Sequence, residues 1–154
     1  MNQEEIFKII KYIISECNRL KNKYVDEKNL EVDYVCIFSQ NKSEFNQLHK
    51  AAESLGKIVD ETPMGPVFAF SSQPKTIAGS PKLLKIRKPD ATRTQRGDVD
   101  FNTDYPSFKS KYLDNKAFTL IMRENFEMIE LKDNSFDVLV YFSSTSLSKQ
   151  LGII

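Results

Sequence analysis

The segment Val-Asp-Tyr-Val-Cys-Ile-Phe at residues 32–38 begins a pattern that the chain repeats. Its β-branched and aromatic residues predict a strand, and a helix and three further strands follow it up to residue 89. Gly-Asp-Val-Asp-Phe-Asn at residues 97–102 begins a second series of the same order, which ends at residue 143. An internal duplication is stronger evidence for the fold class than any single residue, because each unit must bury its apolar face against the other.

Capping and turn residues set the expected limits of the helices inside the two units. Ser43 is the predicted N-cap of the first helix, and Gly56 is predicted to end it. Asp104 is the predicted N-cap of the second helix, with Pro106 in its first turn, where proline is tolerated. The tail at 147–154 is predicted as a short helix or an ordered terminus.

A further helix is predicted before the first unit, over residues 1–24. Apolar residues recur there at spacings of three and four, which places them on one face: Ile6, Ile9, Ile10, Ile13, Ile14, Cys17 and Leu20. This amphipathic helix has two possible partners, the sheet of its own chain or a helix of another protein.

These elements predict an α+β fold in one domain, residues 1–154. Two βαβββ units, residues 32–89 and 97–143, would form a curled mixed sheet or half-barrel with the helices outside. The concave side of such a sheet is the expected place for a binding site. Whether the units pair within one chain or between two stays open, so both a monomer and a homodimer are compatible with the sequence.

Composition excludes some functions and favours a location. A net charge of +1 gives no reason to expect a nucleic-acid-binding surface. No apolar run approaches the roughly 20 residues that span a bilayer, so no membrane partner is expected. The acidic start lacks the basic region of a secretion signal, which favours the cytoplasm. Cys17 and Cys36 lie among apolar residues and are predicted to be buried free thiols, with a disulfide as the alternative.

The paired arrangement resembles the vicinal oxygen chelate superfamily of glyoxalases and ring-opening dioxygenases, and most of all its YecM-type proteins. The resemblance covers nearly the whole chain and is carried by Val32-Asp33-Tyr34-Val35, Gly65-Pro66-Val67-Phe68-Ala69-Phe70, Leu84-Lys85-Ile86-Arg87-Lys88-Pro89 and Gly97-Asp98-Val99-Asp100-Phe101. It implies a cleft in which His and Glu side chains of the first and fourth strands of each unit hold a metal ion.

This chain departs from that ligand set. Tyr34 and Asp100 stand at the first-strand histidine positions, and Lys85 stands at the fourth-strand glutamate position of the first unit. His49 is the single histidine, and it falls in a predicted helix outside the cleft, where we expect it at the surface. A histidine metal site is therefore excluded, and zinc is an unlikely cofactor.

Strand alternation places a mixed set of polar side chains on the concave face. The set comprises Tyr34, Lys85, Arg87, Asp98, Asp100, Arg123 and Glu130. Three interpretations remain open. The charges form an internal network of ion pairs. Alternatively, Tyr34, Lys85, Arg87 and Arg123 bind a small anionic molecule. In the third interpretation Asp98, Asp100 and Glu130 hold a divalent metal such as Mn²⁺ or Mg²⁺.

Two classes of function follow. The first is a small-molecule-binding cleft; if the protein is an enzyme, Asp100 or Glu130 would act as the base and Lys85 with Arg87 as an electrostatic clamp. The second is a non-catalytic interaction or scaffold module that kept the fold after the metal ligands were lost. The basic linker with Arg93 and Arg96 has two interpretations, a solvated connector between the units, which we favour, or a loop that binds an anion or a nucleic-acid phosphate.

Overall fold

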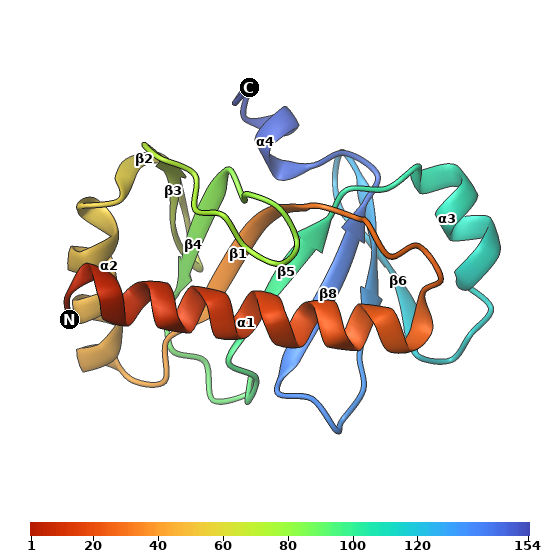
Figure 1. Ribbon diagram of the computed structural model, residues 1–154, viewed down its shortest axis with the longest axis horizontal. Helices are drawn as coiled ribbons and strands as arrows, with labels where there is room; N and C mark the ends of the chain where they lie inside the picture. Colours follow the sequence, from red (N-terminus) through yellow and green to blue (C-terminus); the bar gives the residue numbers. More distant parts are fainter.

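The computed structural model describes residues 1–154 and contains one mixed sheet of eight strands. The strand order across the sheet is β2-β3-β4-β1-β5-β8-β7-β6 (Figure 1). The strands are β1 (Val32–Phe38), β2 (Gly56–Thr62), β3 (Gly65–Phe70), β4 (Leu83–Arg87), β5 (Gly97–Phe101), β6 (Phe118–Met122), β7 (Glu127–Leu131) and β8 (Val138–Ser143). The helices are α1 (Gln3–Tyr24), α2 (Lys42–Glu53), α3 (Tyr105–Tyr112) and α4 (Leu147–Gln150).

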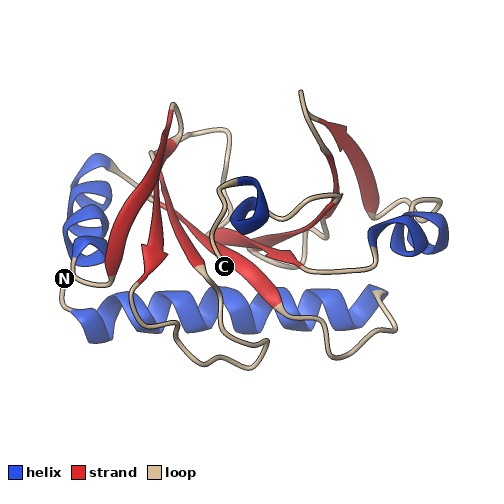
Figure 2. Ribbon diagram, turned by 90° about the horizontal axis from the view of Figure 1, so that it is seen from above, coloured by secondary structure: helices blue, strands red, loops and turns tan.

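The two predicted units form the two halves of this sheet. Within the first half β1 runs parallel to β4, and within the second half β5 runs parallel to β8 in the matching position. The halves join where β1 and β5 pair antiparallel. The sheet curls strongly without closing, and the edge strands β2 and β6 stay unpaired on their outer sides (Figure 2). The predicted α+β fold with an N-terminal helix is therefore confirmed.

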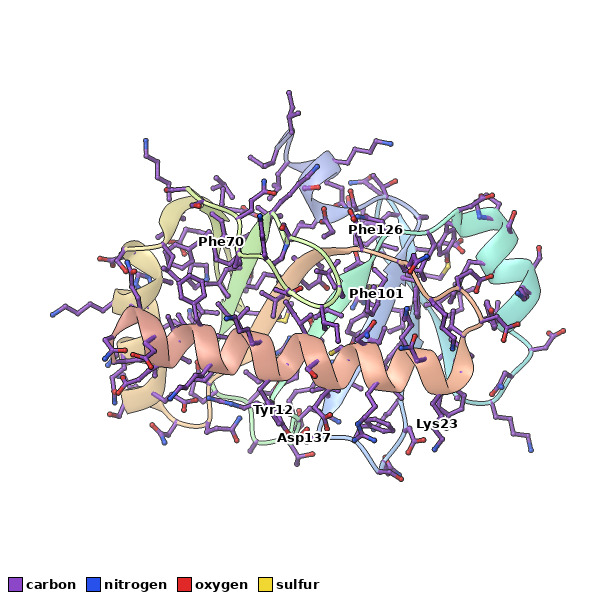
Figure 3. All side chains as sticks on the ribbon, viewed as in Figure 1. Tyr12, Lys23, Phe70, Phe101, Phe126 and Asp137 are labelled. Atoms are coloured by element: carbon purple, nitrogen blue, oxygen red, sulfur yellow. The ribbon has the colours of Figure 1, made fainter.

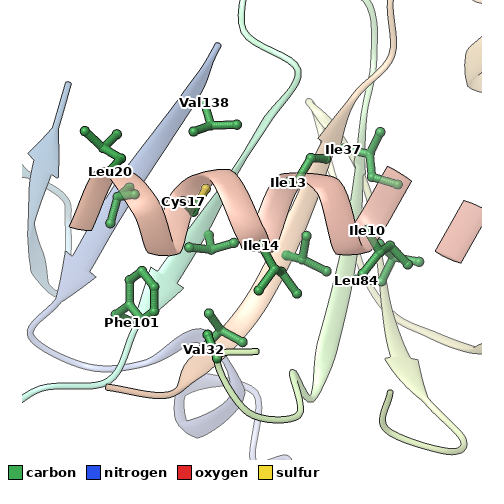
Figure 4. Packing of buried hydrophobic residues seen from close by; sticks show 14 of the residues in the cluster. Ile10, Ile13, Ile14, Cys17, Leu20, Val32, Ile37, Leu84, Phe101 and Val138 are labelled. Atoms are coloured by element: carbon green, nitrogen blue, oxygen red, sulfur yellow. The ribbon is translucent and has the colours of Figure 1, made fainter. Parts of the chain in front are cut away.

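Helix α1 covers the convex face and runs across the strands (Figures 1 and 4). It begins in a capping box, in which the Asn2 side chain accepts from the Glu5 amide and the Glu5 carboxylate accepts from the Asn2 amide. Its apolar stripe is fully buried in the main core: Ile6, Ile10, Ile13, Ile14, Cys17 and Leu20. The sheet of its own chain is thus the partner of this helix.

Polar contacts fix the same helix beside the loop between β7 and β8. The Tyr12 hydroxyl donates to the Asp137 carboxylate at 2.9 Å, and Lys23 Nζ lies 2.6 Å from Asp133 Oδ2 (Figure 3). The Tyr24 hydroxyl also donates to Asp133. These contacts join α1 to the loop between β7 and β8.

Some predicted helix limits are wrong. Asn41, rather than Ser43, is the N-cap of α2, and its side chain accepts from the Glu44 amide at 2.8 Å. Gly56 does not follow the helix directly but opens β2, where a Cβ would lie 2.0 Å from the Ala69 carbonyl oxygen. Asp104 does occupy the N-cap position of α3, with proline in the first turn, although its side chain makes no capping hydrogen bond.

Helix α4 departs from the expected arrangement, because it lies on the concave side of the sheet (Figure 2). Its apolar residues Leu147 and Leu151 pack against a second core cluster that lines this face. Its Ser148 amide donates to the buried Asp33 carboxylate of β1 at 3.0 Å, and the Ser148 hydroxyl donates to the same carboxylate. The tail thus covers one end of the concave face.

The two cysteines and the single histidine have well-defined surroundings. Cys17 and Cys36 are buried free thiols, as predicted. His49 lies on α2 away from the concave face, but it is half-buried between the rings of Phe45 and Phe68 rather than a surface residue. None of the four helices combines the length and the apolar character needed to cross a membrane.

Candidate functional site

The strand register arranges the polar side chains of the concave face in rows. Cys36 on β1 is opposite Lys85 on β4 and opposite Asp98 on β5. Neighbouring strands lie about 4.8 Å apart, so the backbone positions of Lys85 and Asp98 are about 10 Å apart with Cys36 between them. In the next row, Tyr34 is opposite Asp100. In these rows Lys85 comes from β4, and Asp98 and Asp100 come from β5.

These residues line a pocket of about 220 Å³. Six of the seven polar residues predicted for the concave face are in its wall: Tyr34, Lys85, Arg87, Asp98, Asp100 and Arg123. Glu130 is not in the wall, but its carboxylate accepts from the Tyr141 hydroxyl at 2.7 Å, and Tyr141 lines the pocket. The structure therefore brings the predicted residues together around one hollow, while their roles stay predictions.

The cations of the pocket are held mainly by aromatic rings. Lys85 Nζ lies 4.7 Å from the ring centroid of Tyr34. The Arg87 guanidinium carbon lies 5.5 Å from the ring centroid of Phe38. Arg87 also contacts Asp90 at 3.4 Å. A cation over a ring is oriented without being neutralised, so the charge of Lys85, which has no ion-pair partner, remains available to a ligand.

Asp98 is the most unusual group in the pocket. Its side chain is almost fully buried, at 6% exposure, and its Oδ1 atom has no hydrogen-bond partner in the protein. Burial raises the pKa of Asp98 to about 6, and the nearby charges of Lys85, Arg87 and Arg93 oppose that rise. At neutral pH this carboxyl is therefore mostly ionised and lacks a direct donor.

Asp100 differs from Asp98, although both lie on the same strand and face. Its Oδ1 atom accepts from the Ser143 amide at 3.1 Å. Burial raises the pKa of Asp100 well above its ordinary value, and the hydrogen bond from Ser143 offsets only part of that rise. Its hydrogen bond to a backbone amide distinguishes Asp100 from Asp98. The role of Asp100 as the base of a reaction stays a prediction.

The thiol and the two phenols on this face are protonated near neutral pH. Burial raises the pKa of the Cys36 thiol and of the Tyr34 and Tyr141 phenols far above their ordinary values. Nucleophilic chemistry requires the thiolate rather than the thiol, so Cys36 is not activated. In the pocket wall, four cationic side chains outnumber the two carboxyls of Asp98 and Asp100: Lys85, Arg87, Arg93 and Arg123.

The residues do not fit the metal site that the resemblance implies. No group of three or more histidine, cysteine, aspartate or glutamate side chains converges in a geometry that could hold an ion. Asp98 and Asp100 lie on β5, whereas Glu130 lies on β7 and accepts from Tyr141. The lysine and arginines around Asp98 would also repel a cation. We therefore derive no chemistry from a metal here.

Sequence reasoning missed several residues of the pocket. The linker is exposed at Ala91, Thr92 and Thr94, but its Arg93 lines the pocket. Arg96 forms an ion pair with Glu44 at 2.8 Å. Tyr141 and the apolar residues Met64 and Phe126 complete the wall. The density of positive charge in the linker was the available signal for Arg93. Met64 lies in the turn between β2 and β3, and no local pattern predicts that this turn reaches the pocket.

Comparison with known proteins supports the fold and gives no information about the site. No family model and no curated protein matches the sequence. A solved structure titled "Structural Genomics, Protein EC4020" is similar, with a TM-score of 0.73 over 97% of this chain and 91% of that chain. The sequence identity is 9%, so the likeness concerns the arrangement of helices and strands alone.

Proposed function

We propose that the concave pocket binds a small anionic molecule carrying a carboxylate or phosphate group. The observation that carries this proposal is the excess of positive charge around a hollow of about 220 Å³. Lys85 makes no ion pair with any acidic side chain, although it lies on the pocket wall. Arginine and lysine side chains held in a partly buried hollow form strong, charge-assisted hydrogen bonds with such groups.

The shape of the pocket limits the size of this ligand. Met64, Phe126, Met128 and Leu147 add apolar surface at its wall. A volume of about 220 Å³ is small among ligand pockets, which typically measure about 300–1,000 Å³. The ligand is accordingly a small metabolite with a short apolar part, and the cytoplasm, where two buried free thiols would persist, is its proposed location.

The duplicated βαβββ arrangement also supports a relationship with the vicinal oxygen chelate superfamily. Proteins of that superfamily hold their ligands through a metal ion in the same concave place. Here Lys85 stands where the resemblance places a glutamate ligand, and Tyr34 and Asp100 stand where it places histidines. In this proposal the charge that attracts the ligand comes from the protein's own cations.

Calorimetric titration of the purified protein at pH 7 and low salt tests the proposal. The probes are succinate, malate, inorganic phosphate and glycerol 3-phosphate. We expect at least one to bind, and we expect Lys85→Gln and Arg93→Gln each to weaken its affinity by tenfold or more, since a hydrogen bond to a charged group is worth about 1.5–3 kcal/mol. Lys50→Gln is the matched control, because Lys50 is exposed on α2 outside the pocket.

Two outcomes would contradict the proposal. One is that none of the four probes binds. The other is that binding occurs but the Lys85 and Arg93 variants bind as tightly as the Lys50 variant, which would place the anion elsewhere on the molecule.

A further inference from the structure

Two polar atoms inside the pocket wall lack a hydrogen-bond partner in the protein, and one is an acceptor whereas the other is a donor. Asp98 Oδ1 is a buried acceptor without a donor, and Arg87 Nε is a buried donor without an acceptor. An unpaired buried polar atom costs about 1–3 kcal/mol of stability, so such atoms are rare in folded proteins. Both occur in the wall of the same hollow.

A fully ionised carboxylate would satisfy only one of these two atoms. Its oxygens accept hydrogen bonds and so suit Arg87 Nε, but they have nothing to donate to Asp98. An anion placed against Asp98 would also meet a second negative charge. A ligand that satisfies both atoms must carry a negatively charged group that accepts hydrogen bonds. It must also carry a hydrogen-bond donor a few covalent bonds away.

The surroundings of Asp98 indicate which donor is compatible. Lys85, Arg87 and Arg93 are all close enough to act on the Asp98 charge. A ligand ammonium group at Asp98 would be repelled by these three cations, whereas a hydroxyl group donates a hydrogen bond without adding charge. The limited volume of the pocket requires the hydroxyl to lie close to the anionic group.

We propose that the pocket selects a hydroxylated anion, a short hydroxy acid or hydroxylated phosphate ester. The anionic group accepts from Arg87 Nε and lies beside Lys85, and the hydroxyl group donates to Asp98 Oδ1. This inference rests on the proposed function, because it names the chemical class of the anion bound there.

Matched pairs of probes test this selectivity by calorimetry at pH 7. Malate is compared with succinate, and glycerol 3-phosphate with propyl phosphate, so that the two arms separate carboxylate from phosphate ligands. We expect the hydroxylated member of at least one pair to bind ten or more times more tightly, because a site built to hydrogen-bond a hydroxyl group strongly rejects the analogue without it. In Asp98→Ala we expect this preference to fall below about threefold, while the unhydroxylated member still binds.

Asp98→Val is a second variant for the case in which the alanine variant does not fold. Valine suits a β-strand, and replacing an unpaired buried carboxyl by an apolar group removes a destabilising charge. Equal binding of both members of each pair by the unaltered protein would overturn the inference and leave the proposed anion site intact. A hydroxyl preference that survives in the Asp98 variants would also overturn it. Failure of every probe to bind would remove the proposed function as well.

Discussion

At the residue scale, the two aspartates of β5 show how position alone gives identical side chains different hydrogen bonds and different pKa values. Asp100 has a backbone donor and a pKa far above its ordinary value, whereas Asp98 has no donor and a pKa raised only to about 6. The difference follows from their neighbours, since the strongest influences on Asp98 after burial are the three cations Lys85, Arg87 and Arg93. Asp98 is therefore the group whose charge changes near physiological pH.

Asp98→Asn is expected to stabilise the protein at pH 8 but much less at pH 4. A carboxyl with a higher pKa in the folded chain binds more protons there than when unfolded, so stability falls as pH rises from about 4 to about 6. Above pH 6 the cost of the buried charge is fully present, and asparagine avoids it. We expect a gain of about 1–3 kcal/mol in unfolding free energy at pH 8, measured by urea denaturation.

Asp100→Asn is the matched control for this titration. Burial raises the pKa of Asp100 well above its ordinary value, and the side-chain amide oxygen of asparagine can still accept from the Ser143 amide. Its stability profile from pH 4 to pH 8 therefore reports the titration of Asp100 separately from that of Asp98. If Asp98→Asn had the same effect on stability at pH 4 and at pH 8, the assigned titration of Asp98 would be wrong.

At the scale of elements, the sequence predicted the eight strands and the helices α1, α2 and α3 from their periodicity and turn residues, and it left the tail as a short helix or an ordered terminus. The limits of β1 are those predicted, and α1 ends at the predicted residue. The placement of α4 was not predictable, since Leu147 and Leu151 indicate an apolar face but not the surface that it covers. The deciding contact joins Ser148 to Asp33, two residues 115 positions apart, and neither has a local pattern that points to the other.

Ser148→Ala is expected to release α4 from the concave face. The substitution removes the hydroxyl donor and leaves the buried Asp33 carboxylate with the Ser148 amide alone. An unsatisfied buried acceptor costs about 1–3 kcal/mol, so the unfolding free energy should fall by that amount. Hydrogen exchange of the amides at 147–153 should accelerate, because a segment held by few contacts opens first.

Ser110→Ala is the control for the loss of a serine hydroxyl. Ser110 is exposed on α3, and its substitution should leave both stability and the exchange of α4 nearly unchanged. Unchanged exchange at 147–153 in the Ser148 variant would show that the apolar contacts of α4 suffice to hold it.

At the scale of the whole molecule, the junction of β1 and β5 holds the two halves together. Gly97 on β5 lies at this junction, where a Cβ atom would lie 2.2 Å from the Cys36 carbonyl oxygen and 2.7 Å from Ile13 Cδ1. The first neighbour is backbone and cannot move aside without separating the halves. The duplication was visible in the sequence, whereas the close approach at Gly97 depends on the register of two strands that 58 residues separate.

Gly97→Ala is therefore expected to destabilise the protein strongly, by about 3 kcal/mol or more, as other severe overpacking changes do. Gly152→Ala provides the comparison, because nothing lies within 4 Å of its Cβ position. There the left-handed backbone alone should cost about 1–2 kcal/mol. Thermal unfolding followed by circular dichroism measures both, and a smaller loss at Gly97 than at Gly152 would contradict the structure of the junction.

The duplicated halves have the same order of strands and helices, but they contribute different charged side chains to the pocket. Lys85 and Arg87 come from the first half, Asp98 comes from the second, and apolar side chains such as Phe126 lie at the wall. Three unlike points of attachment distinguish a molecule from its mirror image, which two points do not. A chiral occupant should therefore enter in a single orientation, and its two enantiomers should bind unequally.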